Sequence, residues 1–358
     1  MSAFALTACL TTMELCMDIK KIISYLEECK KQINPEKEPG FCTGIVKNGE
    51  TIHTINHGLS SIEHDSPLTG DSLFYLASES KQFTAACILK LVFEKKIRLS
   101  QDVRALVKEV EQFSEKITIQ NLLNHTSGIA DYFQYIYCQL NRHHSDYFDN
   151  KHILEIISSI EELDFTPNEK REYSNSNYIL LSEIVKVCTG KPISKFASDN
   201  IFKPVGMKNT IFDDDRFKVV KNRVSGYISG AGTSQKYRVD LKNSCTVGDG
   251  GVLSSVNDLI KWEANYHSNQ LLDRPVINGL TKRHKLKNGQ QPLYANGLEH
   301  SPPEAPIPYV FHLGGFEGFS TFILKVPSEK FSLIYLSNSD LTDFKLGTSR
   351  SKKFELIS

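Results

Sequence analysis

Segments that favour β-hairpins stand at both ends of this 358-residue chain, and helical segments fill the middle. Near the N-terminus, Asn48-Gly49 joins residues 43–46 to residues 51–55, and this dipeptide favours a tight type I′ turn. Near the other end, residues 327–330 join the β-rich runs 319–326 and 331–336. Helices are expected between the hairpins, over residues 80–95, 117–124, 152–162 and 178–188, with Gly190 closing the last. The order predicts an antiparallel sheet whose two halves are separated in sequence by a helical insertion.

The charge of the chain is balanced, with 42 basic and 42 acidic residues. No global electrostatic field therefore favours a nucleic acid or an anionic membrane, and we expect no nucleic-acid partner. No apolar stretch approaches the roughly 20 residues that a membrane span needs, so we expect no integral membrane span. The length suffices for one large domain or two modest ones.

The eight cysteines are widely scattered, without a CxxC pair or a Cys/His cluster at zinc-ligand spacing. The sequence therefore predicts no metal site and no cofactor. Scattered cysteines suit free thiols in a reducing compartment, which favours the cytoplasm. An exported or lipoprotein form is the alternative, because Leu6-Thr7-Ala8-Cys9 is similar to a lipoprotein cleavage box. No Lys or Arg precedes that box and the apolar run is short, so we interpret residues 1–17 as an extended start rather than a leader.

The first candidate for chemistry is Ser78-Glu79-Ser80-Lys81. If a helix begins near Ser78, a spacing of three residues puts Ser78 and Lys81 on one face, within reach of a hydrogen bond. A serine hydroxyl is a weak nucleophile until a neighbouring base takes its proton, and a lysine can be that base when its surroundings favour the neutral amine. The spacing alone is weak evidence, because Ser349-Arg350-Ser351-Lys352 matches the same pattern.

Two further motifs carry groups that suit acyl transfer. Tyr173-Ser174-Asn175 offers a phenol that can relay a proton and an amide that can hold a substrate, and Tyr294-Ala295-Asn296 fits the same pattern. His312-Leu313-Gly314-Gly315 precedes the last hairpin, where glycines would let a backbone N–H approach a ligand closely.

The order of these motifs resembles that of the serine β-lactamase-related family, which includes class C β-lactamases, D,D-peptidases and esterase-like penicillin-recognising serine hydrolases. The resemblance covers roughly residues 35–340. It includes the segments 121–129, 189–191, 201–210 and 248–255, and the pairs Asp258-Leu259 and Lys261-Trp262. This context selects Ser78 over Ser349 and Tyr173 over Tyr294.

The resemblance implies an α/β (α+β) fold of the β-lactamase/transpeptidase type, with a five-stranded antiparallel sheet flanked by helices. It implies a catalytic domain over residues 18–345 with a helical subdomain at roughly 83–245, followed by a polar tail at 346–358. Ser78 would form an acyl-enzyme, Lys81 and Tyr173 would share the proton, and Asn175 would bind substrate. The oxyanion would lie between the backbone N–H groups of Ser78 and Gly315.

Two departures from the family pattern bear on function. His312 stands where many penicillin-binding members carry a lysine, so a permanent positive anchor for a substrate carboxylate is missing. The chain also lacks an apolar C-terminal helix to cover the apolar positions of the N-terminal helix (Leu15, Ile19, Ile22, Ile23 and Leu26), which suggests truncation or a homo-oligomer.

The expected activity is therefore that of a serine hydrolase on a small ester, amide or D-amino-acid peptide, with a small molecule or short peptide as the partner. The alternatives are a weak β-lactamase or D,D-carboxypeptidase, and a non-catalytic binding or scaffold protein of the same fold.

Overall fold

The computed structural model describes residues 19–138, 147–241, 243–268 and 271–340. The proposed extended start at 1–17, the tail at 346–358 and Ser349 lie outside the described residues. Among the described ranges, no helix has the length and apolarity that crossing a membrane requires.

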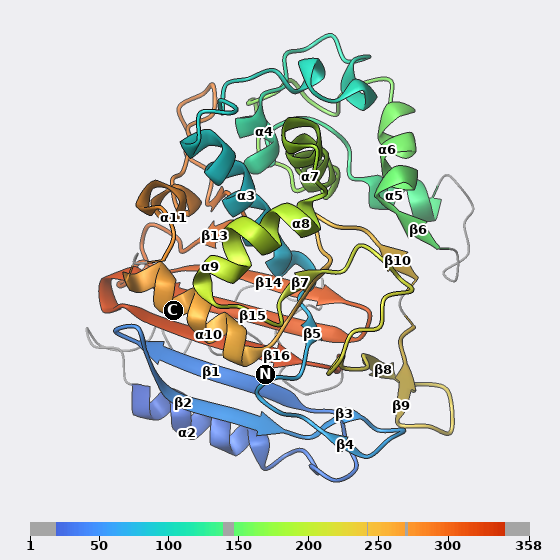
Figure 1. Cartoon of the computed structure of the whole chain (residues 1–358), viewed down its shortest axis with the longest axis vertical. Coiled ribbons are helices and arrows are strands. Elements are labelled where there is room, and N and C mark those ends of the chain that lie inside the picture. The colour runs from blue at the N-terminus through green and yellow to red at the C-terminus, as the bar shows by residue number, and fades with distance from the viewer. Residues whose placement is uncertain (1–18, 139–146, 242, 269–270, 341–358) are drawn as a thin grey trace.

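A seven-stranded antiparallel sheet forms the lower half of the molecule in Figure 1. Its strand order is β12-β13-β14-β15-β16-β1-β2. The strands are β1 (Phe41–Lys47), β2 (Glu50–His57), β12 (Tyr294–Ala295), β13 (Leu298–His300), β14 (Val310–Phe316), β15 (Phe319–Val326) and β16 (Phe331–Ser337). The five long strands are the five that were expected, and the short strands β12 and β13 extend the sheet at the β14 edge. The predicted fold class is confirmed.

The two predicted hairpins lie side by side in this sheet, where β16 pairs with β1. In the first hairpin, Asn48 and Gly49 both have positive φ values, 55° and 83°, as a type I′ turn requires. Strand β1 then pairs with β16, so that Phe41 lies opposite Ser337 and Lys47 opposite Phe331. The halves of the sheet are therefore separated by the helical segments in sequence and joined in space, as predicted.

One helix covers each face of the sheet. Side chains alternate along β16: Leu333 and Tyr335 pack with α2 (Ile19–Lys30), whereas Ile334 and Leu336 belong to the core under α10 (Val256–Ser268). Ile22 and Leu26 of α2 are buried against the sheet, and Ile19 and Ile23 are half-buried beside them. The sheet of the same chain is thus a partner for the described part of this helix face, which corrects the expectation that the face is uncovered there. Leu15 and residues 341–358 lie outside the described residues.

The remaining helices gather in the upper half of Figure 1. They are α3 (Lys81–Phe93), α4 (Ile119–Leu123), α5 (Tyr132–Cys138), α6 (Asn150–Ser158), α7 (Ser176–Thr189), α8 (Ile193–Ala197), α9 (Lys203–Val205) and α11 (Arg274–Leu280). Gly190 closes α7 in a left-handed conformation, as predicted. Helix α6 begins two residues before the predicted start because the Asp149 carboxylate caps it, accepting from the His152 N–H at 3.2 Å.

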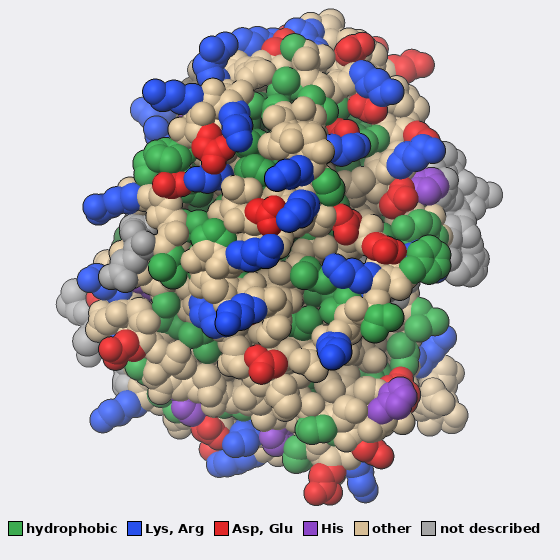
Figure 2. Space-filling model, in the orientation of Figure 1, with side chains coloured by type: hydrophobic (Ala, Val, Ile, Leu, Met, Phe, Trp, Pro, Cys, Tyr) green, Lys and Arg blue, Asp and Glu red, His purple; other side chains and the backbone are tan. Residues whose placement is uncertain are grey.

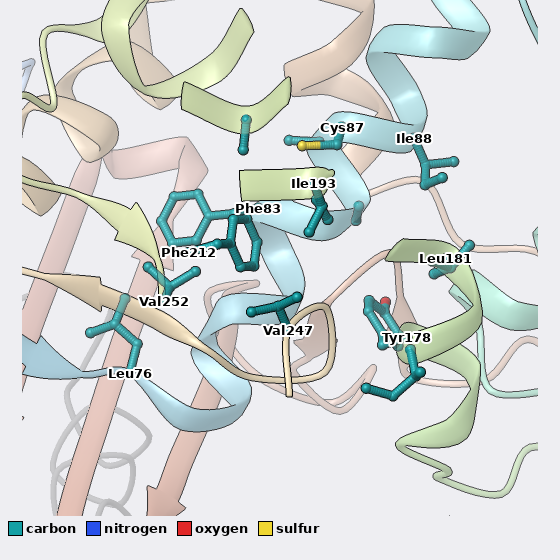
Figure 3. Close-up of a cluster of buried hydrophobic side chains, with 14 of the residues drawn as sticks. Leu76, Phe83, Cys87, Ile88, Tyr178, Leu181, Ile193, Phe212, Val247 and Val252 are labelled. Atoms are coloured by element: carbon teal, nitrogen blue, oxygen red, sulfur yellow. The ribbon is translucent and has the colours of Figure 1, made fainter. Parts of the chain in front are cut away.

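The remaining strands are short and form four small sheets outside the seven-stranded one. They are β3 (Leu59–Ser61), β4 (Ser66–Pro67), β5 (Phe74–Tyr75), β6 (Phe148–Asp149), β7 (Ile211–Phe212), β8 (Tyr227–Ser229), β9 (Tyr237–Val239), β10 (Ser244–Cys245) and β11 (Val252–Ser254). Phe83 and Cys87 of α3 point into a cluster with Ile193, Phe212 and Val252 (Figure 3). This packing holds the start of α3 against α8 and the small sheet β5-β11-β7.

Candidate active site

Ser78 lies in a 3₁₀ turn, Ala77–Ser80, that leads directly into α3. Ala77 just before it has a φ of 48°, a left-handed conformation that L-residues with a side chain adopt at a cost of roughly 1–2 kcal/mol. Such strain persists where the surroundings hold it, and it marks candidate functional sites. The helix expected near Ser78 is thus present, with its first turn wound more tightly than an α-helix.

Lys81 lies one turn further on, fully buried. Its Nζ lies 3.1 Å from Ser78 Oγ, 2.8 Å from Asn175 Oδ1 and 2.6 Å from the Asp249 backbone oxygen. The last two oxygens can only accept, whereas the serine hydroxyl can also donate. The three oxygens match the three hydrogens of an ammonium group, and the hydroxyl can instead donate to a neutral amine. The contact therefore offers a path for a proton between Ser78 Oγ and Lys81 Nζ.

Tyr173 approaches Ser78 from the other half of the molecule, with its Oη 3.1 Å from Ser78 Oγ. Its ring packs on His125 at a centroid distance of 4.3 Å and meets the edge of Tyr294 at 6.2 Å. Tyr294, the alternative tyrosine, directs its hydroxyl at Tyr178 instead, at 3.4 Å. Of the two Tyr-x-Asn motifs, the structure therefore brings Tyr173 to the serine and uses Tyr294 as packing.

Asn175 is held at both ends of its amide. Its Oδ1 accepts from Lys81, and its Nδ2 donates to Asp131 Oδ2 at 2.9 Å. Asp131 is mostly buried, which raises the pKa of its carboxyl, while hydrogen bonds from the backbone N–H groups of Phe133 and Asn175 oppose that rise. Because the carboxylate can only accept, it fixes which end of the Asn175 amide faces Lys81.

The third motif lies on β14, beside the turn that carries Ser78. Gly314 is in such close contact that a Cβ there would stand 2.2 Å from the Leu76 backbone oxygen, whereas a Cβ at Gly315 would meet nothing within 4 Å. His312 is buried, with its Nδ1 2.7 Å from the Leu313 backbone oxygen. Burial and the nearby Lys81 lower the pKa of His312 to about 3, so the ring is neutral at physiological pH.

A cavity of about 140 Å³ opens beside Ser78. It contains the predicted residues Ser78, Asn175 and Gly315 in its wall, and His312 and Gly314 are not part of that wall. The remaining lining residues are Tyr75, Ala77, Tyr132, Phe133, Phe148, Ser244, Thr246, Asp249, Gly250 and Phe316.

Three residues at this site, Asp131, Tyr132 and Asp249, were not singled out from the sequence. Tyr132 Oη donates to Asp249 Oδ2 at 2.7 Å, and both side chains are buried. Asp249 falls within the segment 248–255, on which the family resemblance partly rests. That segment could therefore have pointed to Asp249 as a residue of the site. Asp131 and Tyr132 follow shortly after Gly128, and no pattern in the sequence pointed to them.

A model of the family described as "Beta-lactamase" matches residues 30–352. The chain belongs to the beta-lactamase family. This family member is 30% identical over 311 residues to penicillin-binding protein 4* of Bacillus subtilis, covering 82% of this chain and 67% of the relative. It is 26% identical over 300 residues to a D-aminopeptidase of Gluconobacter oxydans, covering 84% of this chain and 56% of the relative. The beta-lactamase family chain thus spans between about half and two thirds of the length of these curated relatives.

Solved structures share the fold. An octameric penicillin-binding protein homologue from Pyrococcus abyssi superposes with a TM-score of 0.76 at 24% identity, covering 90% of this chain and 74% of that one. A D-amino acid amidase from Ochrobactrum anthropi superposes with a TM-score of 0.71 at 20% identity, covering 90% of this chain and 94% of that one. The β-lactamase family protein is thus a serine hydrolase-like protein with the penicillin-binding-protein fold.

Proposed function

We propose that this chain is a serine hydrolase that forms an acyl-enzyme on Ser78 and acts on a small ester, amide or D-amino-acid peptide. The observation that carries the proposal is the pair of contacts at Ser78 Oγ, 3.1 Å from both Lys81 Nζ and Tyr173 Oη. A hydroxyl held between two groups that can exchange protons, at the wall of a cavity, is the arrangement that nucleophilic catalysis requires.

The proposed reaction moves one proton from the serine to the leaving group. Neutral Lys81 accepts the proton of Ser78 while Oγ bonds to the carbonyl carbon, and the carbonyl π electrons move to its oxygen. The backbone N–H groups of Ser78 and Gly315 are the proposed donors to that oxyanion. As the tetrahedral intermediate collapses, Tyr173 protonates the leaving group and regains its proton from Lys81. Water then attacks the acyl carbon by the reverse proton route and frees Ser78.

The choice of substrate class draws on the relatives and on His312. Among the relatives are a D-aminopeptidase and a D-amino acid amidase, which supports small amides of amino acids as substrates. A neutral, buried His312 offers no positive anchor for the carboxylate of a β-lactam. We therefore favour amidase or esterase chemistry over the weak β-lactamase or D,D-carboxypeptidase alternatives, with Asn175 proposed to contact the substrate.

Labelling with a fluorophosphonate probe tests the nucleophile. We expect the wild-type protein to be labelled and Ser78→Ala to be unlabelled. Ser80→Ala is the matched control, because Ser80 Oγ faces away and accepts from the Val252 N–H at 3.0 Å. This control should still be labelled. It should lose about 1–3 kcal/mol of stability, because the buried Val252 N–H loses its acceptor. Labelling of Ser78→Ala would overturn the assignment, and an unlabelled wild-type protein would favour the non-catalytic scaffold.

A side-by-side substrate assay tests the reaction class. We expect turnover of a small ester and of D-alanyl amides, and much slower turnover of nitrocefin. Faster hydrolysis of nitrocefin than of either other substrate would favour the β-lactamase alternative.

A further inference from the structure

The cavity beside Ser78 combines a buried carboxylate with aromatic side chains. We propose that it is a subsite for an ammonium group, so that the preferred substrate carries a free amine near its scissile carbonyl, with Asp249 as the anionic partner. The identity of the substrate rests on the proposed hydrolase function, whereas the binding of an ammonium group by this cavity does not.

Asp249 is the first observation behind the proposal. It lies in the loop between β10 and β11, is 5% exposed and forms part of the cavity wall. Its Oδ2 accepts from Tyr132, and its Oδ1 is buried without a partner at hydrogen-bond geometry among the described residues. Burial raises the pKa of this carboxyl, while Lys81, Tyr132 and the backbone N–H groups of Asp249 and Gly250 oppose that rise and favour the carboxylate. A buried polar atom left without a partner costs roughly 1–3 kcal/mol, so such atoms usually mark a missing ligand or water. An ammonium group brings three donors and a positive charge.

The aromatic side chains of the wall are the second observation. Tyr132 and Phe133 stack at a centroid distance of 4.5 Å, and Phe316 lies 6.0 Å from Phe133 and 6.3 Å from Tyr75. All four residues line the cavity. The faces of such rings attract cations, and sites for organic ammonium groups commonly combine several rings with an anionic residue.

The third observation is the lack of a partner for an anion. The lining residues of this cavity include no Lys and no Arg. Lys81 lies behind the wall, where its Nζ already has three oxygen partners within 3.1 Å. His312 is buried outside the lining, and burial keeps it neutral. A substrate carboxylate would therefore meet Asp249 without a compensating cation, whereas an ammonium group would be favoured.

The size of the cavity suggests the probe. A cavity of about 140 Å³ is close to the roughly 150 Å³ cavity that holds one benzene molecule in an engineered protein. Benzylamine, benzyl alcohol and benzoate are matched in size and differ in charge. Their binding to the Ser78→Ala protein can be measured by isothermal titration calorimetry, without any covalent reaction.

We expect benzylamine to bind about tenfold or more tightly than benzyl alcohol, in line with a hydrogen-bonded charge pair, and benzoate to bind most weakly. Adding Asp249→Asn, which keeps the shape of the side chain, should remove the preference for benzylamine and leave the affinity for benzyl alcohol unchanged. Equal binding of the three probes, or tightest binding of benzoate, would overturn the proposal. The affinities of benzylamine, benzyl alcohol and benzoate for Ser78→Ala test the ammonium site even if the variant with Asp249→Asn does not fold.

Kinetics separate this proposal from the proposed function. In the wild-type protein, D-phenylalanine amide should be hydrolysed with a kcat/KM at least about tenfold above that of its N-acetylated form, because acetylation removes the charge. If no substrate is hydrolysed while benzylamine still binds selectively, the hydrolase proposal fails and the ammonium site stands. If both amides are hydrolysed equally, the ammonium site fails and the hydrolase stands.

Discussion

At the scale of single residues, Lys81 shows how neighbours can define the role of a base. Two of its three partners, the Asn175 amide oxygen and the Asp249 backbone oxygen, can only accept hydrogen bonds. Only the Ser78 hydroxyl can donate to the amine. Asp131 prevents the Asn175 amide from presenting its NH₂ group to Lys81, since its carboxylate already holds that group. Of the three hydrogen-bond partners of Lys81 Nζ, the Ser78 hydroxyl is thus the one from which a proton can pass to the amine.

Lys81 and Tyr173 are predicted to act as a coupled pair on Ser78. We expect Lys81→Ala and Tyr173→Phe each to slow acylation by about two orders of magnitude or more, the size of a general-base contribution. The double variant should be little slower than the slower single variant, because residues that act as a unit lose rate non-additively. Rates of fluorophosphonate labelling measure this directly.

Two outcomes would contradict the coupling. Fully additive losses would mean that Lys81 and Tyr173 act independently. A Tyr173→Phe protein that labels at the wild-type rate would mean that Lys81 acts alone, since the Tyr294 hydroxyl is directed at Tyr178.

At the scale of elements, the site depends on how closely β14 lies against the turn that carries Ser78. Thr321 Oγ1 donates to the Leu76 backbone oxygen at 2.9 Å, and Gly314 leaves room for this contact. A side chain at position 314 would have to separate the strand from the turn. Thr321 lies on β15, so the backbone next to the strained Ala77 is held by both β14 and β15.

Two neighbouring glycines make a matched test of this contact. Gly314→Ala should destabilise the fold by about 1–3 kcal/mol, the usual cost of forcing atoms into a packed site, and should slow labelling of Ser78. Gly315→Ala enters open space and should leave the melting temperature nearly unchanged. Thermal unfolding and labelling rates of both variants check this. Equal stability of the two variants would show that β14 can shift without cost.

Local patterns explain what the sequence could predict. The Asn48-Gly49 turn and the Ser78–Lys81 spacing are set by neighbours along the chain, and both are found in the structure. The pairing of the two halves of the sheet followed from the order of hairpins and helices. The predicted residues Ser78, Lys81, Tyr173 and Asn175 do lie together, although their catalytic roles stay predictions.

Long-range contacts explain what the sequence could not predict. Lys81 meets the Asp249 backbone from 168 positions away, and Asp249 meets Tyr132 from 117 positions away. No periodicity encodes such pairs. The family resemblance implied a sheet of five strands, and the sequence could not add β12 and β13 because strands of two and three residues are too short for an alternating pattern.

At the scale of the whole molecule, an ion pair is buried between the sheet and α10. Lys325 on β15 and Glu263 on α10 form a salt bridge with both side chains fully buried, and Ser332 Oγ donates to Glu263 at 2.6 Å. The outer surface is different, because Figure 2 shows basic and acidic side chains interspersed over the visible face. The buried pair joins a helix to the sheet at a point where water cannot replace either partner.

Removing one member of this pair should be costly. Lys325→Met should destabilise the fold by about 3–5 kcal/mol, because Glu263 is left as an unpaired buried charge. The double variant Lys325→Met, Glu263→Met should recover most of that loss, since neither charge remains. Denaturant unfolding of the two variants and the wild type measures both effects. A double variant as unstable as the single one would mean that packing, not charge, dominates.

Stability should also depend on pH through Glu79, which is buried near Lys325 and Glu263. Burial raises its pKa from 4.5 to about 8, against the opposing effects of Lys325 and the Ile323 N–H. Because the folded-state pKa lies above the unfolded value, the contribution to stability is full below about pH 4.5 and is lost as the pH rises through about 8. Glu79→Gln, which cannot ionise, should reduce the fall in unfolding free energy between about pH 5 and pH 8. A variant with the same slope as the wild type would assign the pH dependence to other groups.

The pairing of β1 with β16 also decides when the molecule can be completed during its synthesis. Strand β1 leaves the ribosome almost 300 residues before its partner β16, since Phe41 pairs with Ser337. Until residues 331–337 have emerged, β1 can form its hairpin with β2 but has an open edge on the other side, which invites pairing with other chains. Strand β14, which lies against the Ser78 turn, also arrives late. The site therefore assembles only near the end of translation. Until then, the unpaired edge of β1 is exposed to pairing with other nascent chains.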